Sequence, residues 1–167
     1  AGEEARTIFA SEAVDGMVDV AASRPLRKIR ENASEAALLR AYNHQIAKVQ
    51  TVRDAFETAT QCLRQLIPAT VYSLYEFDSG TDSLVCRHLV GDANRLIHGL
   101  TIPLGQRVTG WAGANRRTAM NSDASLDLAQ IAKGFQPHLL SAISTPLTDH
   151  DRLIGVLTAY SLQHEAF

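Results

Sequence analysis

The sequence predicts an α+β fold, in which a helical N-terminal region precedes a domain built on an antiparallel sheet. Two observations carry this prediction. Apolar residues recur at helical spacing in the first third of the 167 residues and alternate with period two after Pro68. Pairs of strand-like segments lie near residues 71–90 and 142–161, with short helical stretches between them, an order typical of α+β domains.

Two helices are expected before Pro68. The first covers residues 8–21 and ends before Pro25, because the residue that precedes a proline is pushed out of the helical region. The second is expected as one long helix over residues 32–66. Its start carries an Asn-Ala-Ser-Glu sequence that can cap the free amide groups, and Pro68 stops it.

The apolar stripe of this long helix changes phase about halfway along. A heptad seam in the first half consists of Leu39, Tyr42, Ile46 and Val49. Helical spacing then resumes one residue early, at Val52, so the stripe rotates around the helix. Such a change is typical of a helix that first pairs with another helix and then packs on its own domain, and we expect a dimer contact at the four seam residues. One continuous helix packed on a single core explains the pattern equally well.

Period-two hydrophobicity predicts two hairpins. The first has strands over residues 71–77 and 83–90, joined by an Asp-Ser-Gly-Thr-Asp turn. Residues 96–104 are expected to form a third strand. The second hairpin has strands over residues 142–147 and 153–161.

Three shorter elements are expected between the hairpins. They are a helix over residues 108–115, a strand over residues 118–121 and a helix over residues 126–133. Strand pairs at both ends with these short helices between them indicate an α+β domain on an antiparallel sheet.

The first of these helices belongs to a glycine-rich segment. Gly105 and Gly110 have the spacing of a phosphate-binding loop, but Trp111 and Ala112 stand where that motif needs Lys and then Ser or Thr. A P-loop is therefore excluded. Gly110 and Gly113 leave one helix face without side chains, so the backbone can lie close to a sheet or a ligand. We expect Trp111 to be a core wedge rather than a stacking platform.

Composition excludes several classes of protein. The chain carries 16 Lys+Arg against 18 Asp+Glu, a balance that argues against nucleic-acid binding. No apolar run approaches the ~20 residues of a spanning helix, and no signal peptide is present, so we expect a cytoplasmic protein without a membrane span in this fragment. The two cysteines form no CxxC pair and the six histidines have no ligand spacing, which leaves a zinc site without support.

Five segments occur together in the order and spacing of a known family. They are residues 71–78, 105–111, 121–127, 141–147 and 153–157. Over roughly residues 52–167 the chain resembles a GAF domain. The resemblance implies a central antiparallel sheet of five or six strands with helices on both faces. It also implies that residues 1–51 are a signalling or linker helix and that the family's C-terminal helix is missing, so we expect a piece of a longer protein.

The resemblance further implies a ligand pocket between the sheet and the helices. Its expected lining residues are Trp111, Asn121, Asp123, Phe135, Gln136, Ser141 and Ser144. Asn121 and Asp123 could bind a ligand or cap the following helix, and capping is favoured for Asp123. The Asn-Lys-Phe-Asp-Glu signature of cyclic-nucleotide-binding relatives is not evident after Asn121, which lowers the case for cyclic AMP or GMP.

The predicted function is that of a non-catalytic regulatory domain that binds a small molecule, mediates dimerisation, or both. By resemblance it controls an attached diguanylate cyclase, phosphodiesterase or histidine kinase, in two-component or cyclic-di-GMP signalling. The alternatives are a thiol-based reductase of free methionine sulfoxide, which would use Cys62 or Cys86, and a purely structural dimerisation module. No cofactor is assigned; a haem held by one histidine and a bilin on Cys86 stay open, although a buried, inert thiol is the more frequent case.

Overall fold

The computed structural model describes residues 6, 14, 16–18, 32–67, 69–91 and 94–167. The chain forms two compact units, residues 1–68 and 69–167. Of the helix expected over residues 8–21, the described residues 14 and 16–18 are helical, and the rest of that prediction lies outside the described residues. This division places the second predicted helix with the N-terminal unit.

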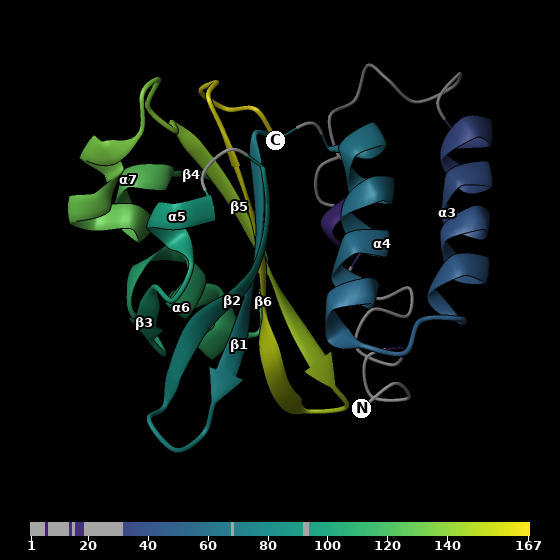
Figure 1. Ribbon diagram of the computed structural model, residues 1–167, viewed down its shortest axis with the longest axis horizontal. Helices are drawn as coiled ribbons and strands as arrows, with labels where there is room; N and C mark the ends of the chain where they lie inside the picture. The colour runs from purple at the N-terminus through teal and green to yellow at the C-terminus, as the bar shows by residue number, and fades with distance from the viewer. Residues whose placement is uncertain (1–5, 7–13, 15, 19–31, 68, 92–93) are drawn as a thin grey trace. The chain divides into compact units, whose positions relative to one another are not determined.

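The first unit contains two antiparallel helices, α3 (Asn32–Ile46) and α4 (Val52–Leu66) (Figure 1). The single long helix expected over residues 32–66 is therefore wrong. The chain turns after Ile46, and the Thr51 side chain accepts a hydrogen bond from the Asp54 amide at 3.1 Å, which caps the start of α4. The phase change of the apolar stripe between Val49 and Val52 marks this turn.

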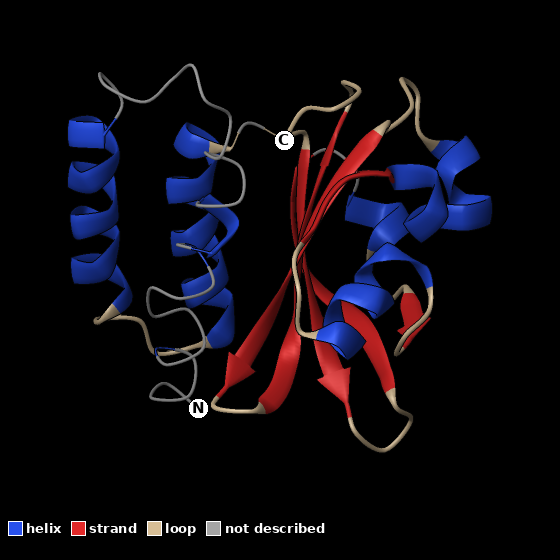
Figure 2. Ribbon diagram, turned by 180° about the vertical axis from the view of Figure 1, so that it is seen from behind, coloured by secondary structure: helices blue, strands red, loops and turns tan. Residues whose placement is uncertain are grey.

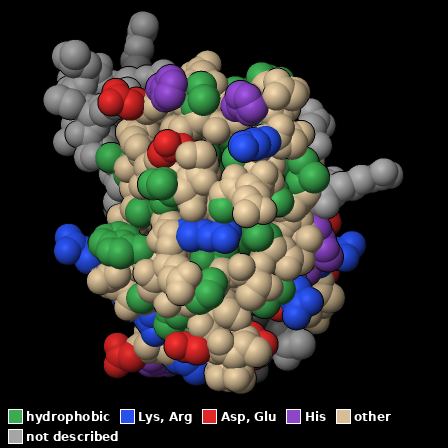
Figure 3. All heavy atoms as spheres, turned by 90° about the vertical axis from the view of Figure 1, so that its left-hand side faces the viewer, with side chains coloured by type: hydrophobic (Ala, Val, Ile, Leu, Met, Phe, Trp, Pro, Cys, Tyr) green, Lys and Arg blue, Asp and Glu red, His purple; other side chains and the backbone are tan. Residues whose placement is uncertain are grey.

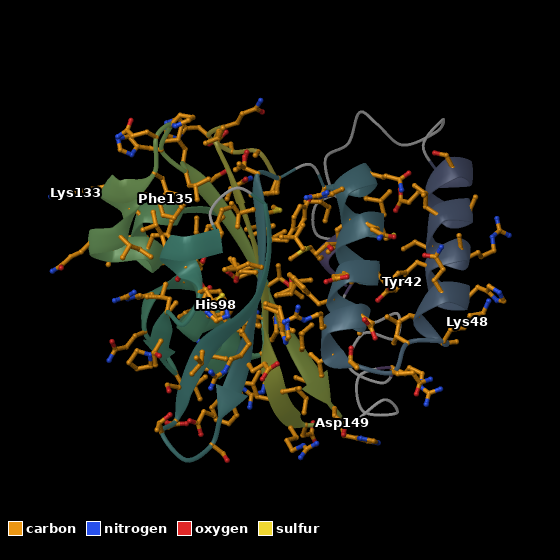
Figure 4. The ribbon with its side chains drawn as sticks, viewed as in Figure 1. Tyr42, Lys48, His98, Lys133, Phe135 and Asp149 are labelled. Atoms are coloured by element: carbon orange, nitrogen blue, oxygen red, sulfur yellow. The ribbon has the colours of Figure 1, made fainter. Side chains whose placement is uncertain are left out.

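The four seam residues lie at or just after α3. Tyr42, Ile46 and Val49 are buried and Leu39 is partly buried. Tyr42 points from α3 toward α4 (Figure 4). Most of the seam is thus withdrawn from solvent within the chain, and the dimer contact predicted there stays a prediction.

The second unit is built on a six-stranded antiparallel sheet in the order β3-β2-β1-β6-β5-β4. The strands are β1 (Val71–Asp78), β2 (Ser83–Gly91), β3 (Thr101–Pro103), β4 (Ala119–Asp123), β5 (Ser141–Asp149) and β6 (Arg152–Ser161). Both predicted hairpins are confirmed, as β1 with β2 and β5 with β6. The central pair, β1 with β6, joins the two hairpins into one sheet.

Short helices cover one face of this sheet (Figure 2). They are α5 (Asn94–Ile97), α6 (Arg107–Asn115), α7 (Ala124–Leu128) and the 3-10 helix η1 (Ala129–Gly134). Between the helices and the sheet lies a buried apolar core to which Tyr75, Cys86 and Leu128 belong. This core fixes the helical layer on the sheet.

Two element predictions need correction. The strand expected over residues 96–104 is the end of α5 followed by the short β3, because Gly99, at φ 79, turns the chain before it can pair with β2. The helix expected over residues 126–133 starts earlier, as α7, and changes to the 3-10 helix η1 after Leu128.

The glycines of α6 allow the close packing that the sequence indicated. A Cβ atom added to Gly110 would lie 2.5 Å from the carbonyl oxygen of Pro103, a distance that no side chain tolerates. The Gly110 carbonyl in turn accepts a hydrogen bond from the Gly105 amide at 2.9 Å. The core-wedge prediction for Trp111 is wrong: this side chain is 42% exposed, because the glycines turn the opposite face of α6 to the core.

Candidate ligand-binding site

The start of α6 is capped by a side chain from another helix. Asp127, on α7, is fully buried, and its Oδ1 accepts a hydrogen bond from the Thr109 amide at 2.8 Å. Its Oδ2 accepts hydrogen bonds from the Thr109 hydroxyl and from the Tyr160 hydroxyl, the latter at 3.1 Å. Gln106, the N-cap residue of α6, makes no side-chain capping bond. The carboxylate therefore satisfies helix amide groups that the local sequence leaves free.

A buried hydroxyl network extends from this carboxylate into the sheet. Tyr75 and Tyr160 share a hydrogen bond of 2.9 Å between their hydroxyl oxygens. The Thr158 hydroxyl lies 2.9 Å from the hydroxyls of both Thr109 and Ser144. The network links α6 and α7 to β1, β5 and β6 through polar contacts inside an otherwise apolar core.

Burial dominates the electrostatics of this network. Desolvation raises the pKa of Asp127 above its ordinary value, and the hydrogen bonds from Thr109 and Tyr160 oppose that rise. Desolvation likewise raises the pKa of Tyr75 and of Tyr160 well above the ordinary tyrosine value. Both tyrosines therefore remain neutral donors, and the single acid of the network is Asp127.

A cavity of about 570 Å³ lies beside this network, between α6, β4 and α7. Its lining residues are Gly105, Arg107, Val108, Trp111, Thr118, Ala119, Met120, Ser122 and Leu126. Trp111, Met120 and Leu126 are three of the five large hydrophobic side chains that are exposed among the described residues. Their exposed apolar surface thus gathers at one cavity, whose volume is within the usual range of ligand pockets.

Figure 3 looks onto this helical side of the second unit, where hydrophobic side chains reach the surface at several points with basic side chains among them. The basic side chain in the cavity is Arg107, at the first residue of α6. Its Nη1 donates a hydrogen bond to the backbone carbonyl of Asp127 at 2.7 Å. The cavity wall and the buried network are therefore joined at Asp127.

Of the seven residues predicted to line a pocket, Trp111 lines this cavity and the other six do not. Ser144 is buried in the hydroxyl network, and the Ser141 hydroxyl donates to the Gln163 carbonyl at 2.6 Å. Phe135, which is labelled in Figure 4, belongs to the core beyond η1. Gln136 is exposed.

Asp123 and Asn121, the other two residues predicted to line a pocket, form hydrogen bonds with the backbone near β4. The Asp123 side chain accepts from the Ser125 amide at 2.8 Å and caps α7, as the sequence favoured. Asn121 forms two hydrogen bonds with the backbone of Phe167, one of them from the Phe167 amide at 2.8 Å. Both side chains are engaged by the protein's own backbone.

Sequence reasoning missed Arg107, Ser122, Leu126 and Asp127. No local signal marks Asp127 as a cap of α6, because its partners Thr109 and Tyr160 lie 18 and 33 residues away. A weak signal existed for Arg107. It stands directly before the start of a predicted helix, where a basic side chain interacts unfavourably with the helix dipole, and such an unfavourable placement can indicate a functional role.

The cysteine environments are not those of reactive thiols. Cys86 is fully buried in β2, and burial raises its pKa to about 12. Cys62, on α4 of the first unit, is also buried. Within the described part of the chain, no group of three or more His, Cys, Asp or Glu side chains is placed to hold a metal ion.

Comparison with known proteins identifies the fold. The GAF domain family model matches residues 51–167. The free methionine-R-sulfoxide reductase from Neisseria meningitidis, solved in complex with its substrate, is similar with a TM-score of 0.63 and 21% identity over 86% of this chain and 82% of that chain. The GAF domain of a phosphoenolpyruvate-protein phosphotransferase from Coxiella burnetii gives a TM-score of 0.66 and 18% identity over 81% and 80%.

The free methionine sulfoxide reductase of Staphylococcus aureus, also in complex with substrate, gives a TM-score of 0.62 and 20% identity over 80% of this chain and 82% of that chain. No curated protein matches the sequence. The described helices include none with the length and apolar character to cross a bilayer. The family model matches most of the chain, and the six-stranded antiparallel sheet of the second unit agrees with that match. The chain therefore belongs to the GAF domain family.

Proposed function

We propose that this GAF domain is a non-catalytic regulatory module that binds a small organic molecule in the cavity between α6, β4 and α7. The observation that carries the proposal is the gathering of Trp111, Met120 and Leu126 around one cavity of about 570 Å³. Exposed apolar side chains that converge on a concave site with few polar groups are typical of ligand pockets.

The thiol chemistry supports a non-catalytic role. Reductase chemistry needs a thiolate that can reach its substrate. Cys86 is buried with a pKa raised to about 12, and Cys62 is buried on a helix of the other unit. The similarity to two methionine sulfoxide reductases is a similarity of fold. Neither cysteine of this chain offers the accessible nucleophile that the reductase reaction uses.

The contacts beside the cavity suit a regulatory role. A ligand that touches Arg107 would act on a side chain bonded to the backbone of Asp127, whose carboxylate connects α6 to Tyr160 on β6. A ligand-induced shift of Arg107 can therefore be transmitted through Asp127 to β6. The attached output domain, the homodimer through α3 and the cytoplasmic location stay predictions.

A pair of matched substitutions tests the ligand-binding role. Ser122→Phe places a large side chain in the cavity, whereas Ser79→Phe places the same side chain in the exposed turn between β1 and β2. Native mass spectrometry of gently purified protein, and thermal shifts against a library of metabolites, should reveal a bound molecule with the unmodified chain and with Ser79→Phe but not with Ser122→Phe. Equal binding by all three proteins, or no binding by any, contradicts the proposal.

The reductase alternative has its own test. We expect no turnover of free methionine sulfoxide in the presence of a dithiol reductant. Turnover that is abolished by Cys86→Ser or Cys62→Ser would establish the enzyme and overturn the non-catalytic role.

A further inference from the structure

The cavity contains one charged side chain, and its charge is not balanced there. The lining residues include Arg107 but no Asp or Glu. Among the described residues, no carboxylate forms an ion pair with Arg107. One nitrogen of its guanidinium is bonded to the Asp127 carbonyl, and a guanidinium has further N–H groups in a fixed plane. The cavity therefore presents directed cationic donors.

The backbone of Arg107 adopts a strained conformation. Arg107 has φ 55, a left-handed conformation that residues other than glycine rarely adopt. The neighbouring Asp127 cap fixes the amide groups of the first turn. Strained residues that surrounding contacts enforce are often found at binding sites, and the side chain of Arg107 lines the cavity.

The remainder of the lining is apolar, with a second polar group on β4. Trp111 lies one helical turn after Arg107 on α6, so the indole and the guanidinium share one side of the helix. Met120 and Leu126 supply flexible apolar contacts. The Ser122 hydroxyl forms no hydrogen bond with the residues that the structure describes, so it is available as a donor.

Building on the ligand-binding role above, we propose that the cavity takes an organic anion, namely a carboxylate attached to an apolar body. The carboxylate binds the guanidinium of Arg107, and the apolar body lies against Trp111, Met120 and Leu126. Arginine favours this class because its planar donors match the geometry of a carboxylate. A neutral ligand would forgo the charge-assisted hydrogen bonds that this exposed guanidinium offers.

Three probes separate the charge from the apolar body. Biphenylacetate carries both, biphenylacetamide has the same body without the charge, and acetate has the charge alone. The chain holds a single tryptophan, Trp111, so its fluorescence reports on the cavity, and calorimetry gives an independent dissociation constant. We expect biphenylacetate to bind at least about tenfold more tightly than either other probe, a factor equivalent to about 1.4 kcal/mol.

Two variants assign that preference to the cavity. Arg107→Gln should weaken biphenylacetate about tenfold and leave biphenylacetamide unchanged. Leu126→Glu adds a carboxylate at a 58% exposed position, so it should fold normally. It should weaken biphenylacetate more than biphenylacetamide, because both probes lose an apolar contact and the acid alone also meets a like charge. Arg87→Gln removes one positive charge from an exposed position on β2, outside the cavity, and should bind all probes as the unmodified chain does.

The outcomes separate the ligand class from the ligand-binding role. Equal affinity for the acid and the amide, unchanged in Arg107→Gln and Leu126→Glu, overturns the anion class while the cavity remains a ligand site. A preference for the acid that Arg87→Gln abolishes as well overturns the assignment to Arg107. Failure of every probe to bind, together with the absence of a retained molecule in native mass spectrometry, overturns both this inference and the proposed function.

Discussion

Replacement of Asp127 tests whether a carboxylate supplied by α7 holds the start of α6. Asp127→Ala removes both acceptor oxygens. Asp127→Asn keeps one acceptor, which can serve the Thr109 amide, and turns the other oxygen into an NH₂ group. That group can donate to the hydroxyls of Thr109 and Tyr160, whose own protons can then turn toward Thr158 and Tyr75, each 2.9 Å away.

The expected magnitudes follow from these contacts. In Asp127→Ala the buried Thr109 amide loses its acceptor, which costs about 1–3 kcal/mol, and α6 loses an anion at its N-terminus, which costs up to about 2 kcal/mol. The hydroxyls keep other partners and add little. Relief from a buried charge offsets part of the loss, so we expect a net decrease of about 2–4 kcal/mol in the free energy of unfolding. For Asp127→Asn the expected change is within about 1 kcal/mol.

Urea unfolding near neutral pH provides the measurement. Trp111 fluorescence follows the transition, because this single tryptophan lies on the helix that the carboxylate caps. Asp151→Ala is the control, since it removes a carboxylate from the exposed turn between β5 and β6 and should change stability by less than about 0.5 kcal/mol. An Asp127→Ala variant as stable as Asp151→Ala, or an Asp127→Asn variant as damaged as Asp127→Ala, would refute the capping role.

Four further outcomes are expected. Burial raises the pKa of Asp127, so the folded state favours the protonated side chain, and the stability linked to that proton is present below the ordinary pKa of 3.8 and is lost as pH rises through the folded-state pKa; urea unfolding should show Asp127→Asn gaining stability relative to the unmodified chain as pH rises above about 4. Gly110→Ala should cost about 1–3 kcal/mol in the same assay because its Cβ meets the backbone beside it. Neither Cys62 nor Cys86 should react quickly with Ellman's reagent until urea exposes them, given their burial; a fast native reaction would contradict it. If α3 forms the predicted dimer, Leu39→Lys should give monomers in light scattering, and a monomeric unmodified chain would exclude the dimer.

Local signals were enough for most of the second unit. The turn residues between Asp78 and Asp82 and the period-two pattern on either side predicted the first hairpin, because hairpin register depends on neighbours close in sequence. The same holds for the Asp123 cap of α7, whose partner Ser125 is two residues away. The break before α4 also had two local signals, Thr51 followed by Asp54 and the change of phase of the apolar stripe at Val52.

The sequence by itself determined the fold class, the two hairpins, the glycine face of α6 and the resemblance to the GAF family, because all of these depend on periodicity, turn chemistry and local spacing. Tertiary structure alone decided the site. The exposure of Trp111 depends on which face of α6 the glycines turn to the core, and Arg107 and Leu126 line one cavity because α6 and α7 pack beside β4. The buried carboxylate of Asp127 acquires its role from Thr109 and Tyr160, distant residues that folding brings within hydrogen-bond distance.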